Sequence, residues 1–324
     1  MEKQLIKNLK IGDEVETQAL VLEANKTKYA SPHRAGEQFM KLTLGDVSGT
    51  VRGIIWDLNL LSEPLEKGEV VFLKGSVNEY HGPQIVIKEI KKLAPDKVNR
   101  RYLQPMSDRD PQEMLQELKK IITEEVENSS LQRLLKKVFS DKNFVQKFAQ
   151  APAAKTVHHN YVGGLLEHTL EVVDLSKKIA EMYPDQINQD VLLTGAILHD
   201  MGKVEEYDMD SLNFELTDRG KLLGHISIGK EMLDRCIHQL EEFPQELKLE
   251  LEHVLLTHHG KKEWGSPEIP KTIQAFALYY ADLVSARISQ FSKLMHSHQS
   301  QETFWTEWDR FLERSAFVKK LNDE

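Results

Sequence analysis

The chain has 324 residues, of which 40% are hydrophobic and 29% are charged, and its formal net charge at pH 7 is −9. This length predicts two domains, and no apolar run reaches the roughly 18 residues that a transmembrane helix needs. The composition therefore argues against an integral membrane protein, and the acidic balance is not that of a strongly basic nucleic-acid-binding protein.

The cysteine content and the first residues indicate the cellular compartment of the protein. The single cysteine, Cys236, cannot form an internal disulfide, and the opening residues MEKQLIKNLKIGDEVE lack the apolar stretch of a signal peptide. We therefore expect a cytoplasmic location. The charge is unevenly spread: residues 1–95 hold 13 Lys and Arg against 13 Asp and Glu, so the acidic excess lies beyond residue 95.

Residues 11–93 alternate short apolar runs with turn residues, a pattern typical of β-strands. The predicted strands are Glu16–Glu23, Gln38–Leu44, Thr50–Ile55, Val70–Val77 and Ile85–Ile90. A short helical piece, Asn59–Leu65, falls between the third strand and the fourth. Five strands with a helix before the fourth is the order of an OB-fold barrel, so we predict an all-β OB domain over residues 1–95.

Residues 96–112 break this pattern and are predicted to be a linker, because turn residues such as Pro105-Met106-Ser107-Asp108 replace the apolar runs. From Pro111 onward, apolar residues recur at helical spacing almost to the end of the chain. The sequence therefore predicts a two-domain protein, in which an all-α domain over residues 113–324 follows the barrel.

The helical part holds most of the histidines, and several stand at predicted helix ends. His168 lies in Gly163–Thr169, His199-Asp200 follows the helix Val191–Leu198, His225 opens His225–Leu240, His258-His259 follows Leu247–Thr257, and Asp282 lies within Ile273–Ile288. An unpaired carboxylate such as Asp200 is costly in apolar surroundings, and a cation removes that cost. Imidazole and carboxylate ligands together favour Mn, Fe, Co, Ni or Zn over Ca.

The order of His168, His199-Asp200 and Asp282 resembles the HD superfamily of metal-dependent phosphohydrolases. This resemblance implies an HD-type helical fold in which these residues bind a divalent metal. Lys203 matches a lysine of the superfamily and would offset charge on a phosphoryl oxygen. Alternatively, Lys203 is only a cation favoured by the C-terminal end of a helix dipole.

The additional histidines, His225 and His258 or His259, resemble those of binuclear HD enzymes, in which Asp200 would bridge two ions. Two ions can polarise one phosphate and activate a water molecule. Adjacent helical residues point about 100° apart, so the sequence leaves open which of His258 and His259 is the ligand. The Gly-Tyr-Pro of HD-GYP enzymes is missing after these histidines, which argues against cyclic dinucleotides as substrates.

Over essentially the whole chain, the OB domain, the linker and the HD domain resemble the YhaM-type 3′-to-5′ exoribonucleases. The most specific part is the motif HHNYVGGLLEHT, which runs from His158 to Thr169. The resemblance implies removal of nucleotides from the 3′ ends of single-stranded RNA, and in some cases of single-stranded DNA. It implies Mn²⁺ or Co²⁺ as the ions, with Fe²⁺, Ni²⁺, Zn²⁺ or Mg²⁺ as alternatives. His158 and His159 would contact substrate phosphate, or would form a solvated helix start.

The same resemblance suggests a nucleic-acid-binding face on the barrel, made of Phe39, Lys41, Arg52, Trp56 and Tyr80. Single-strand-binding proteins pair aromatic stacking with cationic side chains. Alternatively, Phe39 and Trp56 belong to the barrel core, and the contacts come from Lys26, Lys28, His33 and Arg34 or from Lys97, Arg100 and Arg101. Because a neutral barrel offers few phosphate contacts, a homo-oligomer with several barrels is favoured.

The resemblance to the YhaM-type family thus implies a metal-dependent 3′-to-5′ exoribonuclease that releases nucleoside 5′-monophosphates from single-stranded RNA. One alternative is a phosphohydrolase of small nucleotides, in which the OB domain is a scaffold. Another is a nucleic-acid-binding regulator with an inactive HD site. The intact set of His168, His199, Asp200 and Asp282 argues against the regulator, because an inactive site has no need of all four.

Overall fold

The computed structural model describes residues 4–29, 32–34, 36–80, 82–94, 97–154, 159–209, 211–212, 214–297, 303–310 and 312–318. The chain divides into two compact units. The first comprises Met1–Pro105 with Ser211–Asn213, and the second comprises Met106–Asp210 with Phe214–Glu324. The division after Pro105 falls within residues 96–112, the stretch for which the sequence predicts a linker. His158 and the other residues outside these ranges are not described further.

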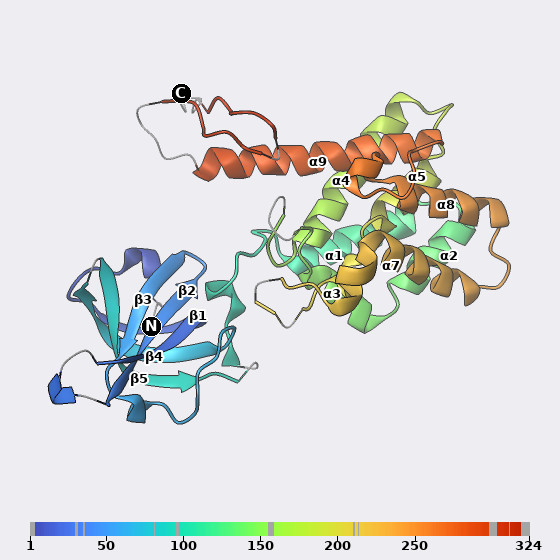
Figure 1. Ribbon diagram of the computed structural model, residues 1–324. Helices are drawn as coiled ribbons and strands as arrows, with labels where there is room; N and C mark the ends of the chain where they lie inside the picture. The colour runs from blue at the N-terminus through green and yellow to red at the C-terminus, as the bar shows by residue number, and fades with distance from the viewer. Residues whose placement is uncertain are drawn as a thin grey trace. The chain divides into compact units, whose positions relative to one another are not determined.

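The first unit is a closed five-stranded barrel with the strand order β1-β2-β3-β5-β4 (Figure 1). The strands are β1 Glu14–Lys28, β2 Gln38–Asp46, β3 Gly49–Ile55, β4 Val70–Glu79 and β5 Pro83–Lys92. β1 pairs with β4 through its first half and with β2 through its second half, and the register shifts between Val21 and Glu23. Such a shift bends a strand, which lets one long strand belong to both sides of a barrel. The order and closure are those of an OB fold.

Between β3 and β4 the sequence predicts a helix over Asn59–Leu65, and this expectation is wrong in length. The structure has a single 3₁₀ turn, Leu58–Leu60, and the side chain of Asp57 accepts a hydrogen bond from the Asn59 amide at its start. The apolar residues that suggested a helix instead pack on the barrel core: Leu65 is buried there, and Leu60 and Leu61 lie against it. Local periodicity is a weak guide here, because tertiary packing decides the conformation of so short a segment.

The second unit is all-α. Its helices are α1 Pro111–Lys120, α2 Ser129–Val138, α3 Lys142–Gln150, α4 Gly164–Met182, α5 Gln189–Leu198, α6 Lys203–Glu206, α7 Asp218–His238, α8 Gln245–Thr257 and α9 Ile273–Ser297. The first of them begins as the sequence indicates, with Pro111 in its first turn and Asp110 accepting hydrogen bonds from the amide groups of Gln112 and Glu113. The fold class is therefore an OB barrel followed by an all-α domain.

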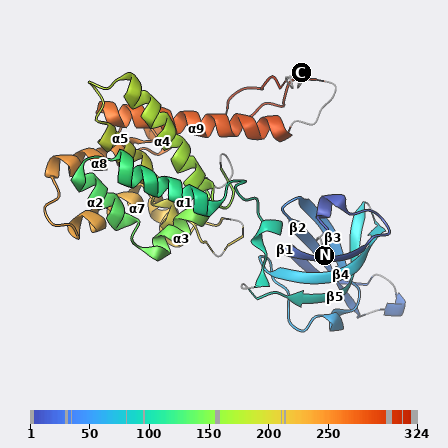
Figure 2. The ribbon, with the colours of Figure 1, turned by 180° about the vertical axis from the view of Figure 1, so that it is seen from behind.

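Helix α5 is the centre of the helical unit and determines where the candidate ligands His199 and Asp200 lie. Every residue from Val191 to Leu198 is buried, which is what an apolar sequence on all sides of a helix requires. Helices α4, α8 and α9 pack around it (Figure 2). Because α5 ends at Leu198, the doublet His199-Asp200 emerges at the end of the most buried helix.

The chain after α9 differs from the sequence-based expectation of helix almost to the end. Residues 303–310 and 312–318 form two antiparallel arms, with bridges between Trp305 and Phe317 and between Asp309 and Arg314. We call this segment the C-terminal hairpin. Its shape is set by tertiary contacts, since Oδ1 of Asp309 accepts hydrogen bonds from both the Leu312 amide and Nε2 of Gln290 on α9. Within the described ranges, no helix is both long and apolar enough to cross a membrane.

Candidate active site and nucleic-acid surface

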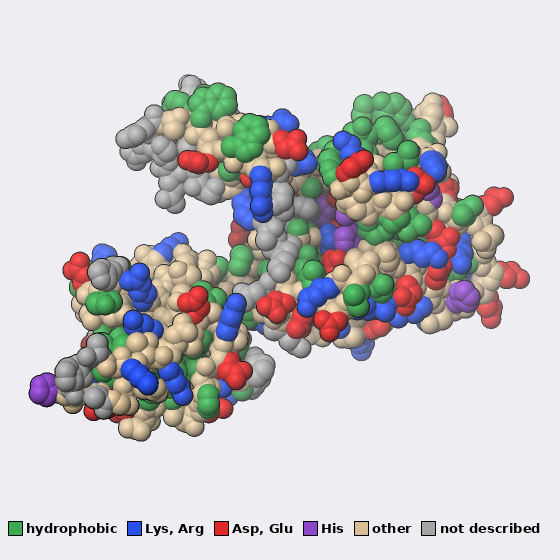
Figure 3. All heavy atoms as spheres, in the orientation of Figure 1, with side chains coloured by type: hydrophobic (Ala, Val, Ile, Leu, Met, Phe, Trp, Pro, Cys, Tyr) green, Lys and Arg blue, Asp and Glu red, His purple; other side chains and the backbone are tan. Residues whose placement is uncertain are grey.

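The helical unit gathers the predicted ligands from five separate segments. His168 lies on α4, His199-Asp200 directly after α5, His225 on α7, His258-His259 directly after α8, and Asp282 on α9. In Figure 3, histidine side chains are visible at the bottom of a hollow in the surface of this unit. Residues that are far apart in the sequence thus meet at one place.

The first group of neighbouring ligand atoms belongs to His168, His199 and Asp282, and these atoms all lie within 4.8 Å of one another. Nε2 of His168 is 3.1 Å from Oδ1 of Asp282 and 3.3 Å from Nε2 of His199. Both rings are buried. The spacing is short enough for the three side chains to hold one ion.

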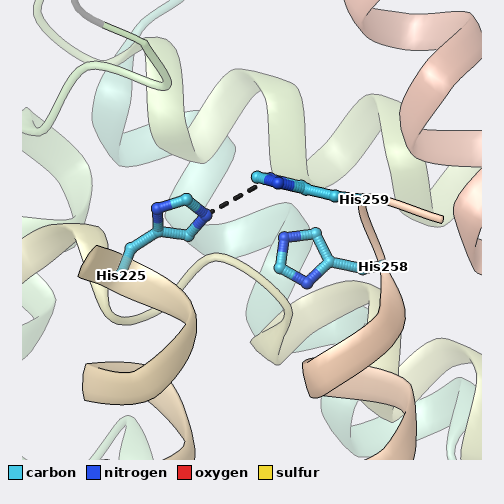
Figure 4. A group of neighbouring side chains, drawn as sticks. All are labelled: His225, His258 and His259. Atoms are coloured by element: carbon cyan, nitrogen blue, oxygen red, sulfur yellow. Dashed lines mark hydrogen bonds between the residues drawn. The ribbon is translucent and has the colours of Figure 1, made fainter. Parts of the chain in front are cut away.

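The second group consists of His225, His258 and His259, whose ligand atoms also lie within 4.8 Å of one another. Figure 4 shows the His225 and His259 rings with their Nε2 atoms facing, and these atoms are 3.3 Å apart. Both His258 and His259 belong to the group because α8 ends at Thr257, so the two histidines lie in the turn that follows. The two rings are neighbours, with their centroids 4.4 Å apart.

Asp200 lies between the two groups. Its Oδ2 is 3.4 Å from Nε2 of His199 and 3.7 Å from Nε2 of His168. Its Oδ1 is 3.4 Å from Nε2 of His225 and 3.6 Å from Nε2 of His258. One carboxylate thus presents a different oxygen to each group, which is the arrangement of a bridging ligand.

Each of the five candidate histidine ligands makes a hydrogen bond through Nδ1, the ring nitrogen that faces away from the centre. The partners of Nδ1 are Ser285 Oγ at 2.9 Å for His168, Ala196 O at 2.8 Å for His199, Glu206 Oε1 at 3.2 Å for His225, Leu255 O at 2.7 Å for His258 and Trp264 O at 3.0 Å for His259. Carbonyl and carboxylate oxygens can only accept, and the Ser285 hydroxyl donates to Glu171, so Nδ1 carries the hydrogen throughout. In its neutral form, each ring therefore presents the lone pair of Nε2 to the centre.

Burial sets the protonation of most of the imidazoles. It lowers the pKa of His168 and of His258, and it lowers the pKa of His259 to about 3. Burial also acts to lower the pKa of His199, but the charges of Asp200 and Asp282 outweigh it and leave that pKa raised. Most of the rings are therefore neutral at neutral pH, which is the form that binds metals.

The carboxyl groups are ionised at neutral pH, and their surroundings fit a metal. Burial would raise the pKa of Asp200, but Lys203 and His199 outweigh it and leave the pKa well below its usual range. The pKa of Asp282 is also lowered, because His168 outweighs burial. Among the described residues, Oδ1 of Asp200 and Nε2 of His258 are buried without a hydrogen-bond partner. Buried acceptors facing other lone pairs are costly unless a cation lies among them.

The barrel brings the five predicted binding residues to one surface. Phe39, Lys41, Arg52, Trp56 and Tyr80 all line one cavity of about 350 Å³. Trp56 and Tyr80 are exposed, whereas Phe39 is buried and packs against the Trp56 ring at a centroid distance of 5.0 Å. Trp56 also stacks on Tyr29, with the ring centroids 5.8 Å apart. The surface thus combines exposed aromatic rings with two cations.

Comparison with known proteins gives relatives that match along nearly the whole chain. The 3′-5′ exoribonuclease YhaM of Listeria welshimeri is 34% identical over 299 residues, which cover 91% of this chain and 92% of the relative. The protein of the same name from Bacillus subtilis is 32% identical over 312 residues, which cover 95% and 96% of the two chains. This chain belongs to the YhaM family.

Two family profiles match parts of the chain. The profile described as an HD domain covers residues 165–287, and one described as a putative helicase covers residues 104–192. Among solved structures, the second OB-fold domain of replication protein A from Methanococcus maripaludis is 24% identical. It covers 28% of this chain and 94% of its own, with a TM-score of 0.25. The HD match implies divalent-metal binding, and it contains all the ligands of both groups.

In this member of the YhaM family, the two candidate ligand groups and Asp200, together called the metal-ligand cluster below, open into a cavity of about 710 Å³. Asp200, Lys203, His259 and Asp282 line one part of it. Nζ of Lys203 lies 2.5 Å from Oδ2 of Asp200, and this lysine is buried. Lys203 therefore stands beside the ligand oxygens with its charge directed into the site, rather than on the solvated end of a helix.

His159 does not line this cavity. It is buried, its Nδ1 is 2.7 Å from the Tyr161 hydroxyl and its Nε2 is 3.1 Å from Oε2 of Glu171. Oε2 of Glu171 also accepts a hydrogen bond of 2.6 Å from Ser285, which in turn accepts one from His168. His159 thus lies behind the first ligand group, where it helps to hold Glu171.

Several residues that support the site were not identified from the sequence. Glu171 and Ser285 each follow a predicted ligand by three positions on its own helix, His168 on α4 and Asp282 on α9, and that spacing was an available signal. Glu206, which holds His225, is a buried acidic residue just after Lys203 in sequence. The C-terminal hairpin offered no such signal, because its contact with α9 is purely tertiary.

Proposed function

We propose that this protein is a metal-dependent 3′-to-5′ exoribonuclease that releases nucleoside 5′-monophosphates from single-stranded RNA. The observation that carries the proposal is the position of Asp200, whose two oxygens face two separate histidine groups. Relatives that match over nine-tenths of the chain carry the name 3′-5′ exoribonuclease. An exoribonuclease also needs a place for a single strand to bind, and the barrel surface offers one.

Two divalent ions would be held at this centre. His168, His199 and Asp282 would hold one ion, His225, His258 and His259 would hold the other, and Asp200 would contact both. Mixed imidazole and carboxylate ligands suit Mn²⁺ or Co²⁺. When bound, such ions supply Lewis acidity, which stabilises charge on a phosphate and makes a coordinated water more acidic.

The side chains of the cavity have distinct tasks in the proposed reaction. The ammonium group of Lys203 offsets negative charge on the reacting phosphate, because it is buried beside the ligand oxygens where its electrostatic effect is large. Ser285, Glu171 and Glu206 keep the imidazoles of His168 and His225 in the orientation that aims Nε2 inward.

On the barrel, Trp56 and Tyr80 stack on bases while Lys41 and Arg52 pair with phosphates. A hydrolase of small nucleotides would have no use for such a surface, which is why we favour a polymeric substrate. Stacking and phosphate contacts do not require a 2′-hydroxyl, so we include single-stranded DNA among the substrates.

Two further parts of the proposal concern the assembly and its location. A homo-oligomer would give one RNA several barrels, and exposed apolar residues spaced four apart on α9, Phe276, Tyr280, Val284 and Ile288, offer a surface for contact between copies. Sedimentation of the purified protein tests this. We propose a cytoplasmic location, where the free cysteine Cys236 stays reduced.

The central test is a nuclease assay with the Asp200→Asn variant, which keeps the shape of the side chain and removes its charge. With Mn²⁺ and 5′-labelled RNA, we expect the unmodified protein to produce a ladder of shortened RNAs and nucleoside 5′-monophosphates. The variant should lose activity by more than about 100-fold, because a ligand shared by both groups is lost. Asp174→Asn on the exposed side of α4 is the matched control.

Blocking the 3′ end of the RNA separates this activity from others. A 3′-blocked RNA should resist the unmodified protein, whereas blocking the 5′ end should have no effect. Undiminished RNA degradation by Asp200→Asn, or cleavage that ignores the state of the 3′ end, would contradict the proposed function. Release of phosphate from free nucleotides, with RNA left at full length, would instead support the small-nucleotide alternative.

A further inference from the structure

The cavity above the metal-ligand cluster has a second part that the proposed chemistry does not use. Beyond Asp200, Lys203 and Asp282, it is lined by Trp264 in the turn after α8, by Tyr279 and Arg287 on α9, and by Arg310, Leu312 and Arg314 of the C-terminal hairpin. The volume of about 710 Å³ lies within the roughly 300–1,000 Å³ typical of sites for small ligands. The HD match ends at residue 287, so the hairpin lies outside it.

The hairpin forms a fixed wall of this cavity. Nε2 of Gln290 on α9 donates a 3.0 Å hydrogen bond to Oδ1 of Asp309. The Thr306 amide donates to the Ala316 carbonyl at 2.9 Å, which joins the two arms. Leu312, at the turn between the arms, is only 4% exposed. These contacts anchor the turn against α9, so the hairpin forms one wall of the cavity.

The chemistry of this second part matches a nucleotide. Trp264 presents a half-exposed indole, and the guanidinium carbon of Arg287 lies 5.7 Å from the centroid of that ring. Arg310 and Arg314 add two more cations on the hairpin side. An aromatic face beside guanidinium groups is the combination that binds a base together with its phosphate. Because Lys203 and the ligand carboxylates line the same cavity, a nucleotide held here would have its phosphate beside the reacting groups.

We propose that this cavity is the subsite for the 3′-terminal nucleotide of the RNA, an inference that rests on the proposed exoribonuclease function. Trp264 stacks on the terminal base, and Arg287 and Arg314 pair with phosphate oxygens next to it. The hairpin turn closes the subsite beyond that nucleotide. A strand that continued past the terminal nucleotide would meet this wall, so the hairpin makes the enzyme select a chain end.

The test compares RNA with a normal 3′-terminal nucleotide and the same RNA with an abasic 3′-terminal ribose. For the unmodified protein, removing the base should raise KM roughly 10-fold, the size expected from the loss of one stacked base. Trp264→Ala should raise KM for normal RNA by a similar factor, and the abasic end should then cause no further rise. Such non-additivity shows that the base and the indole contact each other.

Two controls make the result specific. Trp305→Ala removes an exposed indole of the hairpin that does not line the cavity, and it should keep the full sensitivity to the abasic end. If Trp264→Ala does not fold, Arg314→Ala serves in its place. That variant should reduce the slope of log KM against log salt concentration by about 0.7. Arg133→Ala on α2, also a surface arginine, should leave that slope unchanged.

The outcomes separate the two proposals. One outcome is that the unmodified protein shortens RNA while the abasic end raises KM for Trp264→Ala as much as for the unmodified protein. In that case the subsite proposal is wrong and the exoribonuclease proposal stands. An unchanged salt slope for Arg314→Ala would likewise reject the role of the hairpin. If the unmodified protein with Mn²⁺ does not shorten RNA at all, the exoribonuclease function is wrong, and the subsite falls with it.

Discussion

Replacing Ser285 by alanine tests whether the support behind the first ligand group controls metal binding. The Ser285 hydroxyl accepts a hydrogen bond from Nδ1 of His168 at 2.9 Å and donates one to Oε2 of Glu171 at 2.6 Å. Alanine removes both, which leaves the N–H group of a fully buried imidazole without its acceptor. An unsatisfied buried donor costs about 1–3 kcal/mol.

This cost should appear in the affinity for the ion. Loss of a group that orients a metal-bound imidazole lowers metal affinity by roughly 10- to 100-fold, or about 1.4–2.7 kcal/mol, which agrees with the cost of the unsatisfied donor. The measurement is calorimetric titration of Mn²⁺ into chelator-treated Ser285→Ala and unmodified protein, with thermal unfolding followed in parallel. We expect weaker binding with the helical content retained.

Ser176 provides a matched control on α4, the helix of His168. It is fully buried, and its Oγ has no hydrogen-bond partner among the described residues. Ser176→Ala should therefore be neutral or slightly stabilising and should leave the Mn²⁺ affinity unchanged. If Ser285→Ala is folded and binds Mn²⁺ as tightly as the control, the reasoning about support through Nδ1 is refuted.

The remaining predictions concern pH, packing and RNA binding. Because the pKa of His259 is about 3 in the folded chain and 6.5 in the reference state, the unfolded chain binds more protons between these values. The unfolding free energy of the metal-free protein should thus fall as pH drops from 7 to 5, by about 2 kcal/mol from this residue. Urea titrations of His259→Gln should show a smaller fall, and an equal one would count against the buried neutral ring. In Gly202→Ala, the new Cβ would overlap a backbone oxygen of α7. We expect a loss of about 3 kcal/mol of stability and weaker metal binding, whereas Gly229→Ala, where a Cβ makes only ordinary contacts, should be tolerated. Trp56→Ala should weaken binding of single-stranded RNA to metal-free protein by at least about 5-fold, measured by fluorescence anisotropy, and unchanged affinity would remove the stacking role.

Most elements could be predicted from local patterns because their physics is local. The strands of the barrel follow from period-2 alternation and turn residues, and α5 follows from an apolar run with polar ends. The helix predicted over Asn59–Leu65 and the helical reading of the chain end were wrong. In both stretches the residues satisfy their apolar and polar groups through contacts with distant segments, which no local pattern reveals.

The candidate ligands themselves were predictable, because imidazoles and carboxylates in apolar helical stretches are unusual and stand in the order of the HD superfamily. The sequence by itself determined which residue types could meet a metal: His168, His199-Asp200, His225 and Asp282 carry that chemistry wherever they lie. It could not choose between His258 and His259, because the choice depends on where α8 ends.

Only the tertiary structure decided the remaining features. Helix α8 ends at Thr257, and both of the following histidines belong to one group. His159 contacts Glu171 and does not line the cavity. The tertiary structure also brought the C-terminal hairpin against α9 through Gln290 and Asp309. The physical reason is the same in each case: side-chain direction at a helix end or in a turn depends on packing between segments distant in the chain, whereas the sequence pattern records only the preferences of neighbouring residues.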